Sequence, residues 1–311
     1  MQAQAQEMQT RKIEYPKLAM PTSVQRSAVK IWSNGVALDA DIYRPKDMPA
    51  GKRLPAIVLS HGWGGDKTTG ERYAAKFAQF GMVSLCFSYA GWSGSAGTVL
   101  LAAEQPHLDG RNEGFAKVRC VREMVDPVEW LQNYRSAIDY IEGEPDVDAE
   151  RIGAWGTSFG GGIAMHCAAN DPRIKVLAVQ VASICPVLKG AQLAHARQRA
   201  IDIARGTIAA IPQGLDAYPP LAGTPHLARF LQYDALRAAA KLKVPTLMLD
   251  AGEEELLDIK ANSGKVFEML RSKAIAPVHY KVIEGIDHYG IYFDGFEEGS
   301  EAALAWFAQY L

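Results

Sequence analysis

Short apolar runs alternate along most of the chain with longer segments of helical periodicity. The runs at 54–60 and 244–250 are nearly continuous, which is typical of parallel strands buried on both faces of a sheet. Such runs separated by helical patterns predict an α/β fold, with a mainly parallel sheet and helices on both of its faces. The expected strands are residues 26–32, 36–43, 54–60, 82–88, 152–155, 174–181, 244–250 and 277–283.

Local signals mark a hairpin and several helices. Asn34-Gly35 is a strong hairpin signal between the first two strands. Residues 71–80 carry aromatic side chains at helical spacing, and Gly81 ends that helix. Asp126 and Pro127 open another helix as its N-cap and first residue. Its apolar stripe consists of Leu131, Tyr134, Ile138 and Ile141, and a closing helix is expected at 297–310.

Two regions interrupt this alternation. Residues 91–125 show no clear period, and we expect them to frame the mouth of a pocket, because long irregular loops in compact domains are often functional. The interval between the strands at 174–181 and 244–250 is too long for a simple crossover. It contains helical stretches at 191–204 and 226–240 and a joint at Pro219-Pro220. We predict an N-terminal extension at 1–22 and one domain at 23–311, with a helical cap inserted at about 183–242.

Composition narrows the class of protein. With 311 residues, 48% hydrophobic and 22% charged, the chain is long enough for one sizeable globular domain. A net charge of −2 gives no electrostatic footprint for nucleic acid. There is no apolar run long enough to span a membrane, and we expect no membrane partner. A homodimer is compatible with the sequence.

The cysteines and the N-terminus bear on location. Cys86, Cys120, Cys167 and Cys185 are widely spaced without a C-x-x-C pair, which favours free thiols and a cytoplasmic protein. The polar N-terminus lacks the apolar core of a signal peptide, although the remnant of a removed signal would look the same.

The stretch R-I-G-A-W-G-T-S-F-G-G-G at 151–162 is the strongest chemical signal. It passes from an apolar run into Gly-x-Ser-x-Gly, the spacing of a nucleophile elbow with Ser158 at its tip. The turn is strained and tightly packed, so the flanking positions must be glycine. The backbone N–H of Phe159 then opens a helix, where unpaired donors favour negative charge. This predicts half of an oxyanion hole.

The loop His61-Gly62-Trp63-Gly64-Gly65-Asp66 follows the strand at 54–60. A glycine-rich loop there supplies the second oxyanion N–H in hydrolases, and we assign it to Trp63, with Gly62 as the neighbouring alternative. We expect His61 to tie this loop down by hydrogen bonding, because it precedes the elbow in the wrong chain order for a catalytic base. His195 and His226 have no recognised catalytic spacing, and we expect them on a solvated face.

A serine nucleophile needs a general base, and the base needs a carboxylate to orient it. His288 lies in a loop directly after the strand at 277–283, where a base can reach both nucleophile and leaving group. The acid should follow the strand that ends at Asp250. Glu254 is favoured there, and Glu255 is the alternative.

The order Ser158, Glu254, His288 resembles that of the α/β-hydrolase family over residues 26–311. The segments L-S-H-G-W-G-G-D-K, D-V-D-A-E-R-I-G-A-W-G-T-S-F-G-G-G and E-G-I-D-H-Y-G-I-Y are similar to the dienelactone-hydrolase-like and X-Pro-peptidase-like branch. Dienelactone hydrolases proper use a cysteine at the elbow, so a dienelactone substrate is not implied. The acid of the family is usually aspartate, whereas this loop offers glutamates.

The expected activity is cleavage of an ester, thioester or lactone of a small-molecule acyl substrate, without cofactor or metal. The alternative is acyl transfer or carbon–carbon bond hydrolysis on a polyketide-like substrate with the same residues. The aromatic residues Tyr289, Tyr292 and Phe293 beside the base are compatible with a bulky apolar substrate.

Overall fold

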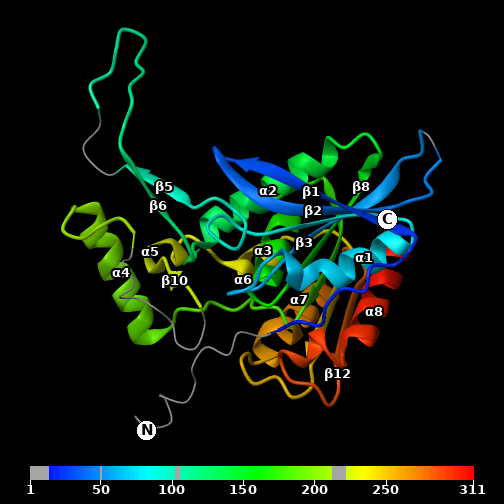
Figure 1. The fold of residues 1–311 in the computed structure, drawn as a ribbon. Helices are drawn as coiled ribbons and strands as arrows, with labels where there is room; N and C mark the ends of the chain where they lie inside the picture. Colours follow the sequence, from blue (N-terminus) through cyan, green and yellow to red (C-terminus); the bar gives the residue numbers. More distant parts are fainter. Residues whose placement is uncertain (1–13, 50, 102–105, 212–221) are drawn as a thin grey trace.

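The computed structural model describes residues 14–49, 51–101, 106–211 and 222–311. An eight-stranded sheet with the order β1-β2-β4-β3-β8-β9-β11-β12 forms its centre (Figure 1). Only the β1–β2 and β2–β4 pairs are antiparallel, so the predicted mainly parallel eight-stranded sheet is confirmed. The strands are β1, Val24–Ser33; β2, Val36–Pro45; β3, Leu54–Ser60; β4, Val83–Phe87; β8, Val147–Thr157; β9, Ile174–Gln180; β11, Thr246–Ala251; and β12, Val278–Ile283.

Helices cover both faces of the sheet, as predicted (Figure 1). One face packs against α1 and α8, and the other against α2, α3 and α7. Within β3, Ile57 and Leu59 point to the first layer while Ala56 and Val58 point to the second. This two-sided burial explains the unbroken apolar runs. The helices are α1, Glu71–Gln79; α2, Pro127–Glu142; α3, Phe159–Ala168; α7, Lys265–Lys273; and α8, Phe296–Tyr310.

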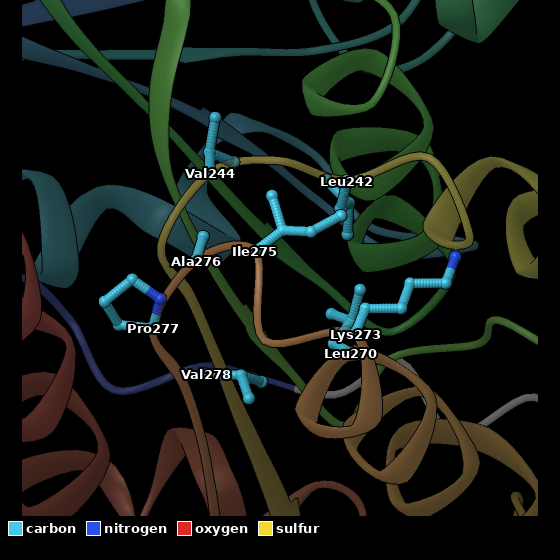
Figure 2. A pocket seen from close by; sticks show the side chains of 8 residues that line it. All are labelled: Leu242, Val244, Leu270, Lys273, Ile275, Ala276, Pro277 and Val278. Atoms are coloured by element: carbon cyan, nitrogen blue, oxygen red, sulfur yellow. The ribbon is translucent and has the colours of Figure 1, made fainter.

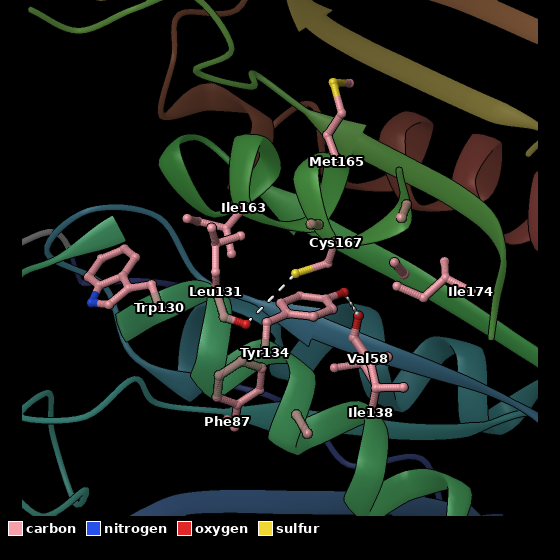
Figure 3. Close-up of a cluster of buried hydrophobic side chains, with 14 of the residues drawn as sticks. Val58, Phe87, Trp130, Leu131, Tyr134, Ile138, Ile163, Met165, Cys167 and Ile174 are labelled. Carbon is pink, nitrogen blue, oxygen red and sulfur yellow. Dashed lines mark hydrogen bonds between the residues drawn. The ribbon is translucent and has the colours of Figure 1, made fainter. Parts of the chain in front are cut away.

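Helix α2 anchors the second layer and begins as predicted. The Asp126 carboxylate accepts hydrogen bonds from the backbone N–H groups of Val128 and Glu129, and Pro127 occupies the first turn. Its apolar stripe is buried against α3 (Figure 3), and the Tyr134 hydroxyl donates to the Val58 carbonyl oxygen at 2.8 Å. This bond satisfies a polar group that would otherwise be costly to bury.

The predicted hairpin also forms. Asn34 and Gly35 have φ angles of 48° and 80°, which a two-residue hairpin turn of this kind requires, and Ser33 pairs with Val36. The strand β8 begins five residues before the expected run at 152–155, because the more polar segment 147–151 is also extended and Val147 pairs with Leu54 of β3.

Residues 91–125, expected to be irregular, contain strands. β5, Thr98–Leu101, pairs with β6, Val118–Val121, and β7, Met124–Val125, pairs with β10, Thr224–Pro225. The partner of β7 lies about a hundred residues further along the chain, so no local sequence pattern predicts this pairing.

The interval between β9 and β11 is partly helical. α4, Gly190–Ala204, agrees with the expected helix at 191–204. The expected helix at 226–240 is wrong, because it is divided into α5, Leu227–Phe230, and α6, Ala235–Ala239. Asp234 separates the two helices, because its carboxylate accepts a hydrogen bond from the Arg237 backbone N–H and so starts α6 as its N-cap. The Pro219-Pro220 joint lies outside the described residues. The cap at 183–242, the extension at 1–22 and the domain at 23–311 stay predictions.

His226 corrects a further expectation. It was expected on a solvated face but is only 9% exposed. Its backbone N–H donates to the Val125 carbonyl, which extends the β7–β10 pairing by one residue and holds His226 against the body of the protein, just before α5. All four cysteines are free thiols, and Cys86 and Cys167 are buried. Within the described ranges, no helix combines the length and apolar character that crossing a membrane requires.

Replacing Asp126 with alanine should lower the free energy of unfolding by about 1–2 kcal/mol, because two amides at the start of α2 lose their acceptor. Asp126→Asn keeps an acceptor oxygen and should cost less, although it weakens the ion pair to Arg229. Urea unfolding followed by circular dichroism measures both. Equal stability of the alanine variant and the wild type would contradict this account of α2.

Candidate active site

Ser158 occupies the turn between β8 and α3. Its φ and ψ angles are 53° and −127°, an unfavourable conformation for a residue with a side chain. Backbone hydrogen bonds hold the turn: the Ser158 N–H donates to Gln180, and the Ser158 carbonyl accepts from Gly161 and Ser183. The surrounding structure thus fixes a strained turn that leaves the Ser158 side chain half-buried.

The glycines on either side of Ser158 allow this turn to pack closely. A Cβ atom on Gly156 would lie 2.4 Å from the Gly160 carbonyl oxygen, and one on Gly160 would lie 2.1 Å from the His61 carbonyl oxygen. Real Cβ atoms do not approach backbone so closely, so both positions require glycine, as the sequence pattern predicts.

The His288 side chain lies between Ser158 and Glu254. Its Nε2 is 3.1 Å from Ser158 Oγ, and its Nδ1 is 2.8 Å from Glu254 Oε2 and 2.9 Å from Oε1. The His288 and Glu254 side chains are 3% and 2% exposed. Glu254 Oε1 also accepts the backbone N–H groups of Leu256 and Leu257, which hold the carboxylate in place. In this arrangement Nδ1–H donates to the carboxylate and Nε2 accepts from the serine hydroxyl.

Of the two candidate acids, the structure brings only Glu254 to the imidazole ring. The Glu255 carboxylate instead accepts the backbone N–H of His288 at 2.9 Å. The sequence did not suggest this backbone contact. Asp250 lies on β11, which ends one residue later at Ala251. Its side chain is 1% exposed and accepts a hydrogen bond from Ser263 Oγ at 3.1 Å. Burial raises the pKa of Asp250 to about 7.

The loop after β3 approaches Ser158 from the opposite side. A Cβ atom on Gly62 would lie 2.7 Å from Ser158 Cβ and 3.3 Å from Ser158 Oγ, so the backbone at Gly62 lies against the serine. The next residue, Trp63, packs its ring on Phe159 with centroids 5.8 Å apart. Phe159 begins α3, where backbone N–H groups have no helical partner.

His61 ties this loop down by hydrogen bonding, as expected. Its Nδ1–H donates to the Gly62 carbonyl at 2.8 Å, and its Nε2 accepts from the Tyr89 backbone N–H at 3.3 Å. Since the Gly62 carbonyl points to His61 and the peptide is planar and trans, the Trp63 N–H points the other way. Burial lowers the pKa of His61 to about 4, so its ring is neutral near pH 7.

The aromatic residues that follow His288 have different environments. The Tyr289 ring lies edge-on to the His288 ring, with centroids 5.2 Å apart. Tyr292, expected among aromatics compatible with a bulky substrate, is buried and points to the interior, where its hydroxyl is 2.5 Å from Thr157 Oγ1. This contact joins the loop of His288 to the residue before Ser158, and no local sequence pattern predicts it.

A small pocket far from Ser158 contains no catalytic group. The pocket in Figure 2 lies at the amino-terminal ends of β11 and β12, opposite Ser158, and apolar side chains such as Leu242, Val244, Leu270 and Ile275 line it. Its one charged residue, Lys273, donates to the Ala240 carbonyl. The described part of the chain contains no cluster of histidine, cysteine or acidic residues that could hold a metal.

Two protein-family models match the chain. Residues 34–187 match X-Pro dipeptidyl-peptidase (S15 family), and residues 130–273 match the BAAT / acyl-CoA thioester hydrolase C-terminal family. The quorum-quenching protein AidA of Acinetobacter baumannii is 32% identical over 163 residues, which are 52% of this chain and 44% of that protein. The acyltransferase drtE of Aspergillus calidoustus is 30% identical over 128 residues, which are 41% of this chain and 35% of that protein. The chain therefore spans less than half the length of these relatives.

Solved structures are similar over nearly the whole chain. They include a hypothetical protein from Pseudomonas aeruginosa (TM-score 0.69, 20% identity, 96% of this chain and 100% of the other). The α/β hydrolase GrgF from Penicillium gives a TM-score of 0.67 with 17% identity over 92% and 99% of the two chains. A putative dienelactone hydrolase from Klebsiella pneumoniae gives 0.59 with 18% identity over 93% and 100%. At these identities the likeness shows a shared fold, the α/β-hydrolase fold.

The burial of His61 predicts a pH dependence of stability. The pKa is about 4 in the folded chain and about 6.5 when unfolded, so below pH 6.5 the unfolded chain binds a proton that the folded chain does not. The stability that His61 contributes is full above pH 6.5 and is lost as the pH falls towards 4. The stability advantage of wild type over His61→Gln should therefore shrink by about 2 kcal/mol between pH 7 and 4.5 in urea unfolding. A constant difference would contradict a buried, neutral His61.

Proposed function

We propose that this chain, which belongs to the α/β-hydrolase superfamily, is a serine hydrolase that cleaves an ester, thioester or lactone through an acyl-enzyme on Ser158. The observation that carries the proposal is the line of contacts from Ser158 Oγ to His288 Nε2 at 3.1 Å and from His288 Nδ1 to Glu254 at 2.8 Å. The thioester substrate class is supported by the match to the acyl-CoA thioester hydrolase family.

In the first half of the reaction, Ser158 Oγ attacks the carbonyl carbon while His288 Nε2 takes the hydroxyl proton. The Glu254 carboxylate keeps the Nδ1–H tautomer and stabilises the imidazolium that forms. His288 then gives the proton to the leaving alcohol or thiol, and the acyl group stays on Ser158. In the second half, His288 activates a water molecule that releases the acid.

The developing oxyanion is held by the backbone N–H groups of Phe159 and Trp63. Two observations support this assignment: Phe159 begins α3, and His61 turns the Gly62–Trp63 peptide so that its N–H faces away from His61. A fixed donor that faces the oxyanion needs no reorganisation during the reaction. Each donor of this kind typically lowers the barrier by about 3 kcal/mol.

An apolar acyl group suits the aromatic surroundings of these donors. The rings of Trp63 and Phe159 both pack against Phe230 of α5, with centroids 5.9 Å and 5.6 Å apart. We propose that the segment at 183–242 covers the site as a cap and that Phe230 contributes to the binding of the acyl chain.

The mechanism predicts that Ser158→Ala and His288→Ala each lower kcat on p-nitrophenyl butyrate by about ten-thousand-fold, since the nucleophile or its base is lost. Glu254→Gln should lose activity to a similar extent, because an amide cannot hold the charged imidazole. The matched control is Glu253→Ala, because the Glu253 side chain makes no hydrogen bond or ion pair with the described residues. Full turnover by the Ser158→Ala variant would rule out the mechanism.

Acyl transfer is the second candidate, because the chain is 30% identical over 128 residues to the acyltransferase drtE. A transferase uses the same acyl-enzyme but gives the acyl group to an alcohol or amine rather than to water. Hydrolysis of a carbon–carbon bond in a polyketide-like substrate stays a further alternative. Hydrolysis predicts that added alcohol leaves free acid as the main product in a chromatographic assay. Predominant formation of the new ester at low alcohol concentration would favour transfer.

A further inference from the structure

The loops that carry the acid and the base continue the pairing of their strands. β11 and β12 are paired as far as Ala251 and Ile283. Beyond them the Gly252 N–H donates to the Ile283 carbonyl at 2.8 Å, and the Glu253 N–H donates to the Ile286 carbonyl at 2.9 Å. The two loops are therefore held side by side up to the residues that precede the proposed acid and base.

At the next step a side chain replaces the backbone as acceptor. The Glu255 carboxylate accepts the His288 N–H at 2.9 Å, two residues after the last backbone contact on each strand. On the other side of His288, the Asp287 carboxylate accepts the Gly290 N–H at 2.6 Å. One carboxylate thus holds the backbone N–H of His288, and a second holds the backbone N–H two residues after it.

Consecutive glutamates therefore contact two different parts of one histidine. Glu254 contacts the imidazole ring, and Glu255 contacts the peptide from which the ring projects. The ring contact alone leaves the distance between Nε2 and Ser158 Oγ sensitive to movement of the His288 backbone. A displacement of about 1 Å at a reacting group can cost about a hundredfold in rate.

We propose that Glu255 is a positioning residue that holds the His288 backbone so that Nε2 faces Ser158, an inference that rests on the proposed function. The acceptor oxygen, rather than the negative charge, performs this role, because the partner is a neutral amide N–H. Glutamine at 255 therefore preserves it and alanine does not.

Three variants separate the acceptor from the charge. Glu255→Ala removes both, Glu255→Gln removes only the charge, and Glu253→Ala removes a charge from the same loop without touching His288. On p-nitrophenyl butyrate, Glu255→Ala should lower kcat about tenfold with KM unchanged. Its rate of labelling by a fluorophosphonate should fall by the same factor. Glu255→Gln and Glu253→Ala should stay within about twofold of wild type.

Hydrogen exchange of the His288 amide gives a readout that does not depend on turnover. Glu255→Ala should speed this exchange about tenfold, whereas Glu255→Gln should not. Unchanged exchange, or an unchanged kcat in Glu255→Ala, overturns the proposal. A Glu255→Gln variant as slow as Glu255→Ala also overturns it. A wild type that neither cleaves the ester nor reacts with the probe would defeat the proposed function instead, and the exchange result would still decide whether Glu255 holds His288.

Discussion

The strained turn at Ser158 is the constraint on which the rest of the site depends. A serine at φ 53° is unfavourable, and it persists because the backbone on all sides of it is hydrogen-bonded and closely packed. The packing requires glycine at 156 and 160, and Gly62 brings the loop after β3 against the serine itself. The Ser158 hydroxyl therefore lies at the carboxyl end of β8, between this loop and the His288 ring.

The parallel sheet explains why distant segments meet at this turn. The loops after β3, β8, β11 and β12 all leave the carboxyl ends of parallel strands in one sheet, which is where open α/β sheets bind ligands. One loop carries Ser158, one Glu254, one His288 and one the proposed second oxyanion donor. Buried contacts below the site, such as Tyr292 with Thr157, connect these loops to one another.

The sequence indicated the strands, the turn at Ser158 and the position of His288 because each has a local signal: continuous apolar runs, glycine spacing and a histidine directly after a strand. It left Glu254 and Glu255 open, since adjacent residues on a loop point in directions set by its turn. That turn is fixed by the amides of Leu256 and Leu257, which any sequence could supply. The burial of His226 and the pairing of β7 with β10 depend on contacts about a hundred residues apart, which leave no local pattern.

We propose that one hydroxyl, at Ser158, becomes nucleophilic through His288. Peptide mapping by mass spectrometry after reaction with a fluorophosphonate tests it most directly. One adduct per chain is expected, located on Ser158, and none should form in the same time when His288 is replaced by alanine. An adduct on a different residue, or equally fast modification of Ser158 without the histidine, would contradict it.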